Sequence, residues 1–238
     1  MKFWIYIFIF ICRIAVSQDF AKDMDKVYNT YKSFKNFGFN VKYILHENHN
    51  INSRIVSQSV GKYVKFDNKT LSVFDENSTL TSGTKIISIN HAEKRISILK
   101  NTKESYAKTP EFLAQFDTYK KHIEKISLLN SSDNNVLYYS VELKRNNITG
   151  LSKYEVVIDK TKSYIIKMTL FYSRKLEKDE NYKVEGTEVP RLDILFTEIN
   201  DKKLFNLNEF SDQYYYSKLH GKIMPSSNFK NYNIKENI

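Results

Sequence analysis

The feature of this sequence that most constrains its fold is a strict alternation of apolar and polar residues in many short runs. In the stretches 39–46, 136–143 and 163–173 almost every second side chain is apolar or aromatic. Side chains of a β-strand point alternately to its two faces, so this period predicts strands with one apolar face each. We therefore expect an antiparallel sheet that is apolar on one side.

Shorter β-rich runs fill the region between residues 54 and 100. They read IVSQSV, KYVKF, LSVF, KIISI and RISIL, and they are separated by Gly61, Asp67-Asn68, Glu76-Asn77, Ser82-Gly83 and residues 91–94. Such runs separated by turn residues predict a meander of hairpins. Further strands are expected at 136–143, 154–159, 163–173 and 192–199, with a tight turn at 159–162, and the charged stretch 174–188 is expected to be a solvated excursion.

Two segments have the period of an amphipathic helix instead. In the first, over residues 20–37, the apolar stripe consists of Phe20, Met24, Val27, Tyr31 and Phe34. In the second, over 110–128, Thr109 and Pro110 are typical of a helix start, and the stripe consists of Phe112, Phe116, Tyr119, Ile123 and Ile126. The predicted fold class is therefore α+β, with eight or more strands and two helices.

The simplest packing of these elements is a curved half-barrel whose concave face is covered by both helices. If the helices do not fill the space, an apolar cavity remains that suits an acyl chain. The alternative is a fully packed α+β core. The side chains expected to face the cavity are Val41, Tyr43, Leu45, Leu137, Tyr139, Val141, Ile166, Met168, Leu170, Ile194 and Phe196.

The first 17 residues are typical of a secretory signal peptide. Lys2 is followed by ten apolar or aromatic residues, a run too short to span a membrane, and Ala15 and Ser17 provide a small-residue cleavage site. We expect cleavage before Gln18, a single domain over 18–238, and a periplasmic or secreted location. Cys12 follows Ile11 rather than a small residue, so a lipid anchor is not expected.

Cleavage also removes the only Cys and two of the 37 basic residues, so 35 basic and 27 acidic side chains remain, a net charge of +8. Disulfides, a Cys nucleophile and Cys-ligated zinc are then excluded, and the core must provide the stability. The positive charge is compatible with an anionic surface, but a Lys-rich solvated surface is the favoured explanation. Nucleic acid is not expected as a partner, because the chain is exported.

Catalytic motifs are missing from the sequence. His46-Glu-Asn-His49 is one residue short of the metalloprotease motif, and G-x-S-x-G, the P-loop and G-x-G-x-x-G do not occur. A glycosidase needs a pair of carboxylates, and Asp193 with Glu198 is one candidate pair. A chain with 27 acidic residues contains many such pairs, so this pair does not indicate an enzyme. Four Asn-x-Ser/Thr sequons, at Asn68, Asn77, Asn130 and Asn147, are interpreted as turn residues. We expect neither an enzyme nor a bound cofactor or metal.

Two strings and the order of the elements resemble the LolA-like periplasmic lipoprotein carrier superfamily, in particular its divergent Bacteroidetes-type members. Residues 61–66, GKYVKF, are similar to the GKFYIK-type strand of that family, and residues 78–89, STLTSGTKIISI, to its turn and following apolar strand. The run 229–232 is similar to closing strands of the divergent members. Family carriers latch their helical lid through an Arg shortly after the GKFYIK-type strand, and the stretch 67–74 has none.

The resemblance implies a non-enzymatic binding protein that holds an acyl chain, a lipid or a lipoprotein, and we expect it to be a monomer. The alternative is an interaction protein of the same fold with a filled core, which docks to an envelope protein complex. An exported hydrolase is a third possibility that the sequence leaves open.

Overall fold

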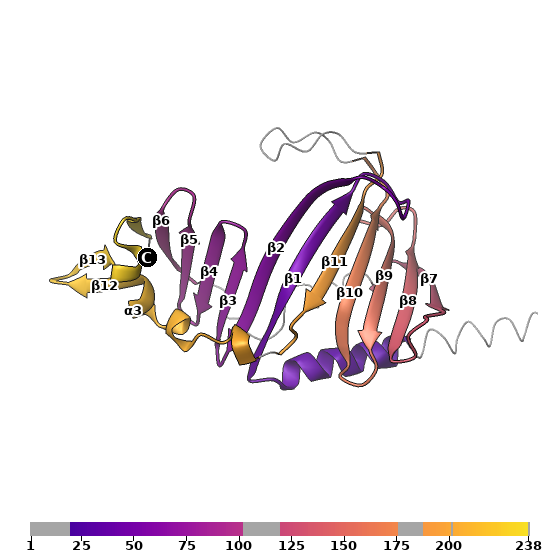
Figure 1. Cartoon of the computed structure of the whole chain (residues 1–238), viewed down its shortest axis with the longest axis horizontal. Helices are drawn as coiled ribbons and strands as arrows, with labels where there is room; N and C mark the ends of the chain where they lie inside the picture. Colours follow the sequence, from indigo (N-terminus) through magenta and orange to yellow (C-terminus); the bar gives the residue numbers. More distant parts are fainter. Residues whose placement is uncertain (1–19, 102–119, 176–187, 201, 238) are drawn as a thin grey trace, which may run out of the picture. The chain divides into compact units, whose positions relative to one another are not determined.

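A computed structural model of the chain describes residues 20–101, 120–175, 188–200 and 202–237 (Figure 1). The expected signal peptide and most of the charged stretch 174–188 lie outside these residues. Residues 20–33 are helical. The strands are β1 (Asn36–His46), β2 (Ile55–Phe66), β3 (Lys69–Phe74), β4 (Asn77–Ser82), β5 (Lys85–Asn90), β6 (Arg95–Lys100), β7 (Ile123–Leu129), β8 (Val136–Leu143), β9 (Leu151–Asp159), β10 (Tyr164–Tyr172), β11 (Arg191–Thr197), β12 (Tyr216–Leu219), β13 (Lys222–Pro225) and β14 (Asn233–Asn237).

Twelve of these strands form one sheet, in the order β14-β6-β5-β4-β3-β2-β1-β11-β10-β9-β8-β7. The pairings from β2 to β6 and from β7 to β11 are antiparallel, as the alternation predicts. β14 instead pairs with β6 in parallel. β12 and β13 form a separate hairpin. The short helices η2 (Lys202–Leu204), η3 (Leu207–Phe210), α3 (Asp212–Tyr215) and η4 (Ser227–Phe229) follow β11 in the sequence.

The second expected helix is not confirmed. Residues 123–128, its last part, lie in strand β7, and the stripe residues Ile123 and Ile126 pair with Leu143 and Val141 of β8. The first part of the segment, 110–119, lies outside the described residues. A spacing of three suits one face of a helix, whereas in a regular strand it places the two side chains on opposite faces. Here a β-bulge between Ile123 and Lys125 sets Ile123 opposite Leu143 and Ile126 opposite Val141, so the strand pairing is kept.

The first helix is confirmed but shorter than expected. It ends at residue 33, because the chain enters β1 at Asn36. Phe20, Met24, Val27 and Tyr31 are buried, as the stripe predicts, whereas Phe34 lies beyond the described helix and is half-buried.

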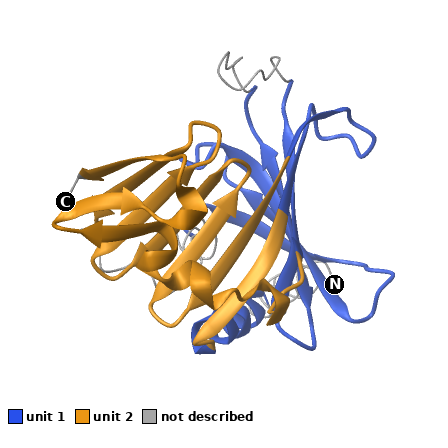
Figure 2. Cartoon of the chain, turned by 60° about the vertical axis from the view of Figure 1, so that its left-hand side comes forward, with its two compact units in different colours: residues 1–33, 42–58, 112–196 blue, residues 34–41, 59–111, 197–238 orange. Residues whose placement is uncertain are grey.

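The chain divides into two compact units, each built from segments that are distant in the sequence (Figure 2). The first unit comprises residues 1–33, 42–58 and 112–196, and the second comprises 34–41, 59–111 and 197–238. The first contains the helix and β7–β11. The second contains β3–β6 and the segment from η2 to β14.

The core of the second unit lies between the strands from β2 to β6 and the C-terminal segment. Its strand residues are apolar at alternate positions, as in Ile87 and Ile89, and the C-terminal segment covers them with aromatic side chains. The buried members are Val64, Leu71, Leu80, Ile87, Ile89, Ile96, Ile98, Leu204, Phe210, Tyr215, Tyr216 and Phe229. The run 229–232, compared with closing strands in the sequence, therefore provides part of this core, and the closing strand β14 follows it.

Gly61 lies inside β2 and does not separate two strands as expected. A Cβ atom at this position would lie 2.9 Å from the backbone oxygen of Val73 and 3.1 Å from Cγ1 of Val41. Real Cβ atoms do not approach a backbone oxygen so closely, so only glycine lets the two strands keep this spacing. The sequence pattern indicates a turn at Gly61, but glycine is needed here because neighbouring strands approach closely.

We expect Gly61→Ala to lower the free energy of unfolding by about 1–3 kcal/mol, because overpacking at a paired strand forces the backbone to move. Urea unfolding followed by circular dichroism measures the change. Gly83→Ala is the matched control, since a Cβ at Gly83 meets no atom within 4 Å. Equal urea midpoints for the two variants would contradict the steric argument.

Candidate functional site

The register of β7–β11 brings many of the expected cavity residues together on one face of the first unit. Directly paired residues share a sheet face. One row across β8, β9, β10 and β11 consists of Tyr139, Val156, Met168 and Ile194. The next row consists of Val141, Tyr154, Leu170 and Leu192. These two rows, with Leu137, Ile158 and Ile165 beyond them, form what we call the apolar face.

The helix at 20–33 lies against this face. The Phe20 ring meets the Tyr139 ring edge-on with centroids 5.0 Å apart, and the Tyr139 hydroxyl donates a 2.8 Å hydrogen bond to Oδ2 of Asp23. At the other end of the helix the Tyr31 hydroxyl accepts a 3.2 Å hydrogen bond from the Ile165 amide. Burial raises the pKa of Tyr31 well above its usual range, so this hydroxyl stays neutral. Apolar packing and two polar contacts thus hold the helix on the sheet.

The eleven expected cavity residues divide into two groups by exposure. Val41, Tyr139, Val141, Met168, Ile194 and Phe196 are buried. Tyr43, Leu45, Leu137, Ile166 and Leu170 are half-buried. The apolar face is therefore packed around Tyr139 and Met168, while other parts of it keep partial access to solvent.

Ile166 and Val41 depart from the expected arrangement, each for a different reason. A β-bulge between Ile165 and Lys167 makes Ile165, not Ile166, the residue opposite Ile158. Ile165 is fully buried. Val41 lies in the part of β1 that belongs to the second unit, beside Gly61.

Sequence reasoning missed part of the apolar face. Tyr154, Val156 and Ile158 of β9 are buried in it, as is Ile165 of β10. The alternation of Tyr154, Val156 and Ile158 in the sequence was the signal for the first three. The sequence has no comparable signal for Ile165, because a bulge shifts the pleat by one residue.

The opposite face of the same strands carries a buried polar cluster around Asp193. The Asp193 carboxylate accepts a 2.8 Å hydrogen bond from the Thr169 hydroxyl and lies 3.0 Å from Nε2 of His46. The ammonium of Lys167 is 3.6 Å away and the guanidinium of Arg191 is 3.5 Å away. This cluster connects β1, β10 and β11.

Arg191 is the most buried charged group of this cluster, at 5% exposure. Its Nη1 donates hydrogen bonds to the carbonyl oxygens of His49 at 3.2 Å and Asn50 at 2.9 Å. Its Nε has no hydrogen-bond partner among the residues that the structure describes. Asp193 is therefore the carboxylate that balances a charge almost completely removed from water.

The residues considered for catalysis or metal binding have separate partners. The His46 ring lies against Asp193, whereas the His49 ring lies 3.1 Å from the carbonyl oxygen of Tyr172. Glu198 accepts a hydrogen bond from Asn40. Within the described residues no group of three His, Cys, Asp or Glu side chains has the geometry of a metal site.

The strands and the helix define the described chain as an α+β protein in which one helix covers one apolar sheet face. No protein-family model and no curated protein match the sequence. Solved structures with a similar chain path include an uncharacterized conserved protein from Thermus thermophilus, with a TM-score of 0.41, 9% identity, and coverage of 76% of this chain and 86% of the other.

Two further similar structures carry names. A LolA superfamily protein from Nitrosomonas europaea has a TM-score of 0.32 and 10% identity, over 82% of this chain and 98% of its own. LprF from Mycobacterium bovis has a TM-score of 0.36 and 8% identity, over 76% and 92%. The first of these is named as a member of the LolA superfamily, which the strings at 61–66 and 78–89 of this chain resemble.

Among the described residues, no helix has the length and apolar character needed to cross a membrane.

Proposed function

We propose that this chain is a non-enzymatic binding protein that holds an acyl chain, of a lipid or of a lipoprotein, on the apolar face of its first unit. The proposal includes export by the signal peptide at 1–17 and a periplasmic or secreted location. An apolar ligand of this kind gains free energy by removing apolar surface from water, at roughly 25 cal/mol per Å².

The observation that carries the proposal is the uneven burial of the apolar face. Leu137 and Leu170 belong to this face, yet they stay half-buried while Tyr139 and Met168 beside them are buried. Tyr43 and Leu45 on β1, next to β11 in the sheet order, are half-buried as well. Apolar side chains that a packed core would cover completely are thus left for a ligand to cover.

Native mass spectrometry and lipid extraction of protein purified from its own host test the proposal. We expect a bound species with an acyl chain at a stoichiometry near one. Protein that carries no lipid and takes up none from vesicles would overturn the carrier function and favour the alternative, an interaction protein with a filled core.

We expect Leu170→Asp to reduce the amount of bound lipid at least tenfold, because it places a charge among half-buried apolar side chains that a ligand would cover. Lipid per mole of folded protein is measured by mass spectrometry after extraction. The matched control is Ile148→Asp in the same unit, since Ile148 is 81% exposed in the loop before β9. If Leu170→Asp retained the lipid of the wild type, the apolar face would not be the binding site.

A further inference from the structure

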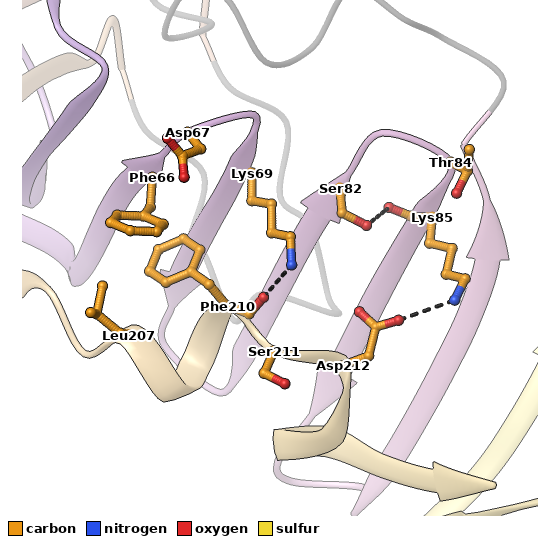
Figure 3. A pocket seen from close by; sticks show the side chains of 10 residues that line it. All are labelled: Phe66, Asp67, Lys69, Ser82, Thr84, Lys85, Leu207, Phe210, Ser211 and Asp212. Carbon is orange, nitrogen blue, oxygen red and sulfur yellow. Dashed lines mark hydrogen bonds and ion pairs between the residues drawn. The ribbon is translucent and has the colours of Figure 1, made fainter.

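A pocket of about 470 Å³ lies in the second unit and shares no residue with the apolar face that carries the proposed function. It is bounded by the turn between β2 and β3, the turn between β4 and β5, and the segment of η3 and α3 (Figure 3). Its volume lies within the range of about 300–1,000 Å³ that is usual for small-molecule sites. Figure 3 shows Phe66, Phe210 and Leu207 at one end of the pocket, with Asp67 beside them, and Lys85 and Asp212 at the other end.

At the charged end of the pocket, Lys85 and Asp212 form an ion pair with each other. Nζ of Lys85 lies 3.0 Å from Oδ2 of Asp212, and the Tyr216 hydroxyl donates a 3.0 Å hydrogen bond to the same oxygen. Burial acts to raise the pKa of Asp212, but the hydrogen bonds from Lys85 and Tyr216 and the nearby positive charges outweigh it and lower the pKa. Asp212 is therefore ionised, and its carboxylate is already bound by Lys85 and Tyr216.

Lys69, between the two ends, has a different environment. Its ammonium donates a 2.5 Å hydrogen bond to the carbonyl oxygen of Phe210. In the described part of the chain no carboxylate lies within 4 Å of its Nζ. The other acidic lining residue, Asp67, is paired with Lys35 at 2.9 Å. Because an ammonium has three N–H donors, Lys69 brings two further donors to the pocket. Its positive charge acts on Asp212 from a distance, but it makes no direct ion pair within the described residues.

The apolar end of the pocket offers a surface for a ring or a short alkyl group. The rings of Phe66 and Phe210 lie with centroids 5.4 Å apart. Leu207 stands beside them with 59% of its surface exposed. A ligand that covers Leu207 gains free energy from apolar contact, while its polar end can face Lys69. The Ser82 hydroxyl also lines the pocket, but it donates a 3.4 Å hydrogen bond to the carbonyl oxygen of Lys85.

From these features we propose that this pocket binds a small monoanionic amphiphile, namely a carboxylate with an aromatic or short aliphatic body. The carboxylate pairs with Lys69, and the body lies against Phe66, Phe210 and Leu207. A carboxylate that accepts hydrogen bonds from an ammonium forms a charge-assisted contact, which is about twice as strong as a neutral one. The site is independent of the apolar face in the first unit.

Phenylacetate is the probe for this site, and 2-phenylethanol and 2-phenylethylammonium are its neutral and cationic counterparts. Binding is followed by amide chemical shifts in ¹H–¹⁵N NMR spectra. We expect phenylacetate to shift the amides of the pocket residues and to bind at least tenfold more tightly than either counterpart. Shifts centred on the apolar face, or equal binding of the three compounds, would overturn the proposal.

Two variants test the two ends of the pocket separately. Lys69→Gln removes the positive charge but keeps a hydrogen-bond donor, and Leu207→Asp changes an exposed side chain at the apolar end. Each is expected to weaken phenylacetate binding at least tenfold. Leu219→Asp is the matched control for the second variant, because Leu219 is 55% exposed on β12, outside the pocket.

The results also separate this site from the proposed function. Leu170→Asp should leave phenylacetate binding unchanged even if it abolishes lipid binding. If Lys69→Gln does not fold, Leu207→Asp decides by itself, since an exposed position tolerates a polar residue. Wild-type affinity in Leu207→Asp would overturn the assignment of the apolar end.

Discussion

Replacing Met168 by aspartate is expected to unfold the protein at room temperature or to bring it close to unfolding. Met168 is 4% exposed and is paired with Val156 on one side and Ile194 on the other. A carboxylate at this position would have no hydrogen-bond partner on the apolar face, which costs roughly 4 kcal/mol or more, a large part of the 5–15 kcal/mol that stabilise a typical domain.

Urea unfolding followed by circular dichroism measures the loss for Met168→Asp. Met168→Leu is the control, because it keeps nearly the same volume and should change the free energy of unfolding by less than about 1.5 kcal/mol. An aspartate variant with the stability of the leucine variant would show that solvent reaches this row. The ligand space would then extend from Leu170 to Met168.

Replacing Asp193 by alanine is expected to destabilise the protein by about 3–5 kcal/mol. The substitution removes the carboxylate that balances the buried guanidinium of Arg191 and takes hydrogen-bond partners from Thr169 and His46. Removing one partner of a buried ionic cluster leaves the remaining charge uncompensated, which costs more than the pair itself contributes. The free energy of unfolding from urea titration measures this loss.

Glu142→Ala provides the control for Asp193→Ala. Glu142 is paired with Lys125 at 3.1 Å, but about half of each side chain is exposed. A solvent-exposed pair of this kind contributes about 0–1 kcal/mol. A loss for Asp193→Ala no larger than for Glu142→Ala would mean that water compensates the Arg191 charge.

The strands with clear alternation were predictable from sequence. Val136–Leu143 is β8 with the expected bounds, and the strands expected at 154–159 and 163–173 correspond to β9 and β10 within a few residues. Period-two patterns specify strands well because one face is buried and the other is not. β4, with the sequence NSTLTS, was not predicted, because its residues are mostly polar. Its pairing with β3 and β5 is what places it in the sheet.

The candidate sites differ in how far sequence could predict them. Tyr139, Met168 and Ile194 were expected on one face, and the register places them in one row. The pocket around Lys69 had no sequence signal, because Lys69 and Leu207 are 138 positions apart in the chain. Only packing of the C-terminal segment against β2–β5 brings them together.

The sequence by itself determined the strand-rich α+β class, the amphipathic helix that begins at residue 20 and most of the apolar face, because these depend on local periods of two and 3.6 residues. The tertiary structure alone decided the strand at 123–129, the bulge at Ile165, the need for glycine at position 61 and the partners of Asp193. These features depend on strand register and on contacts between residues distant in the chain, and local periodicity contains no information about either.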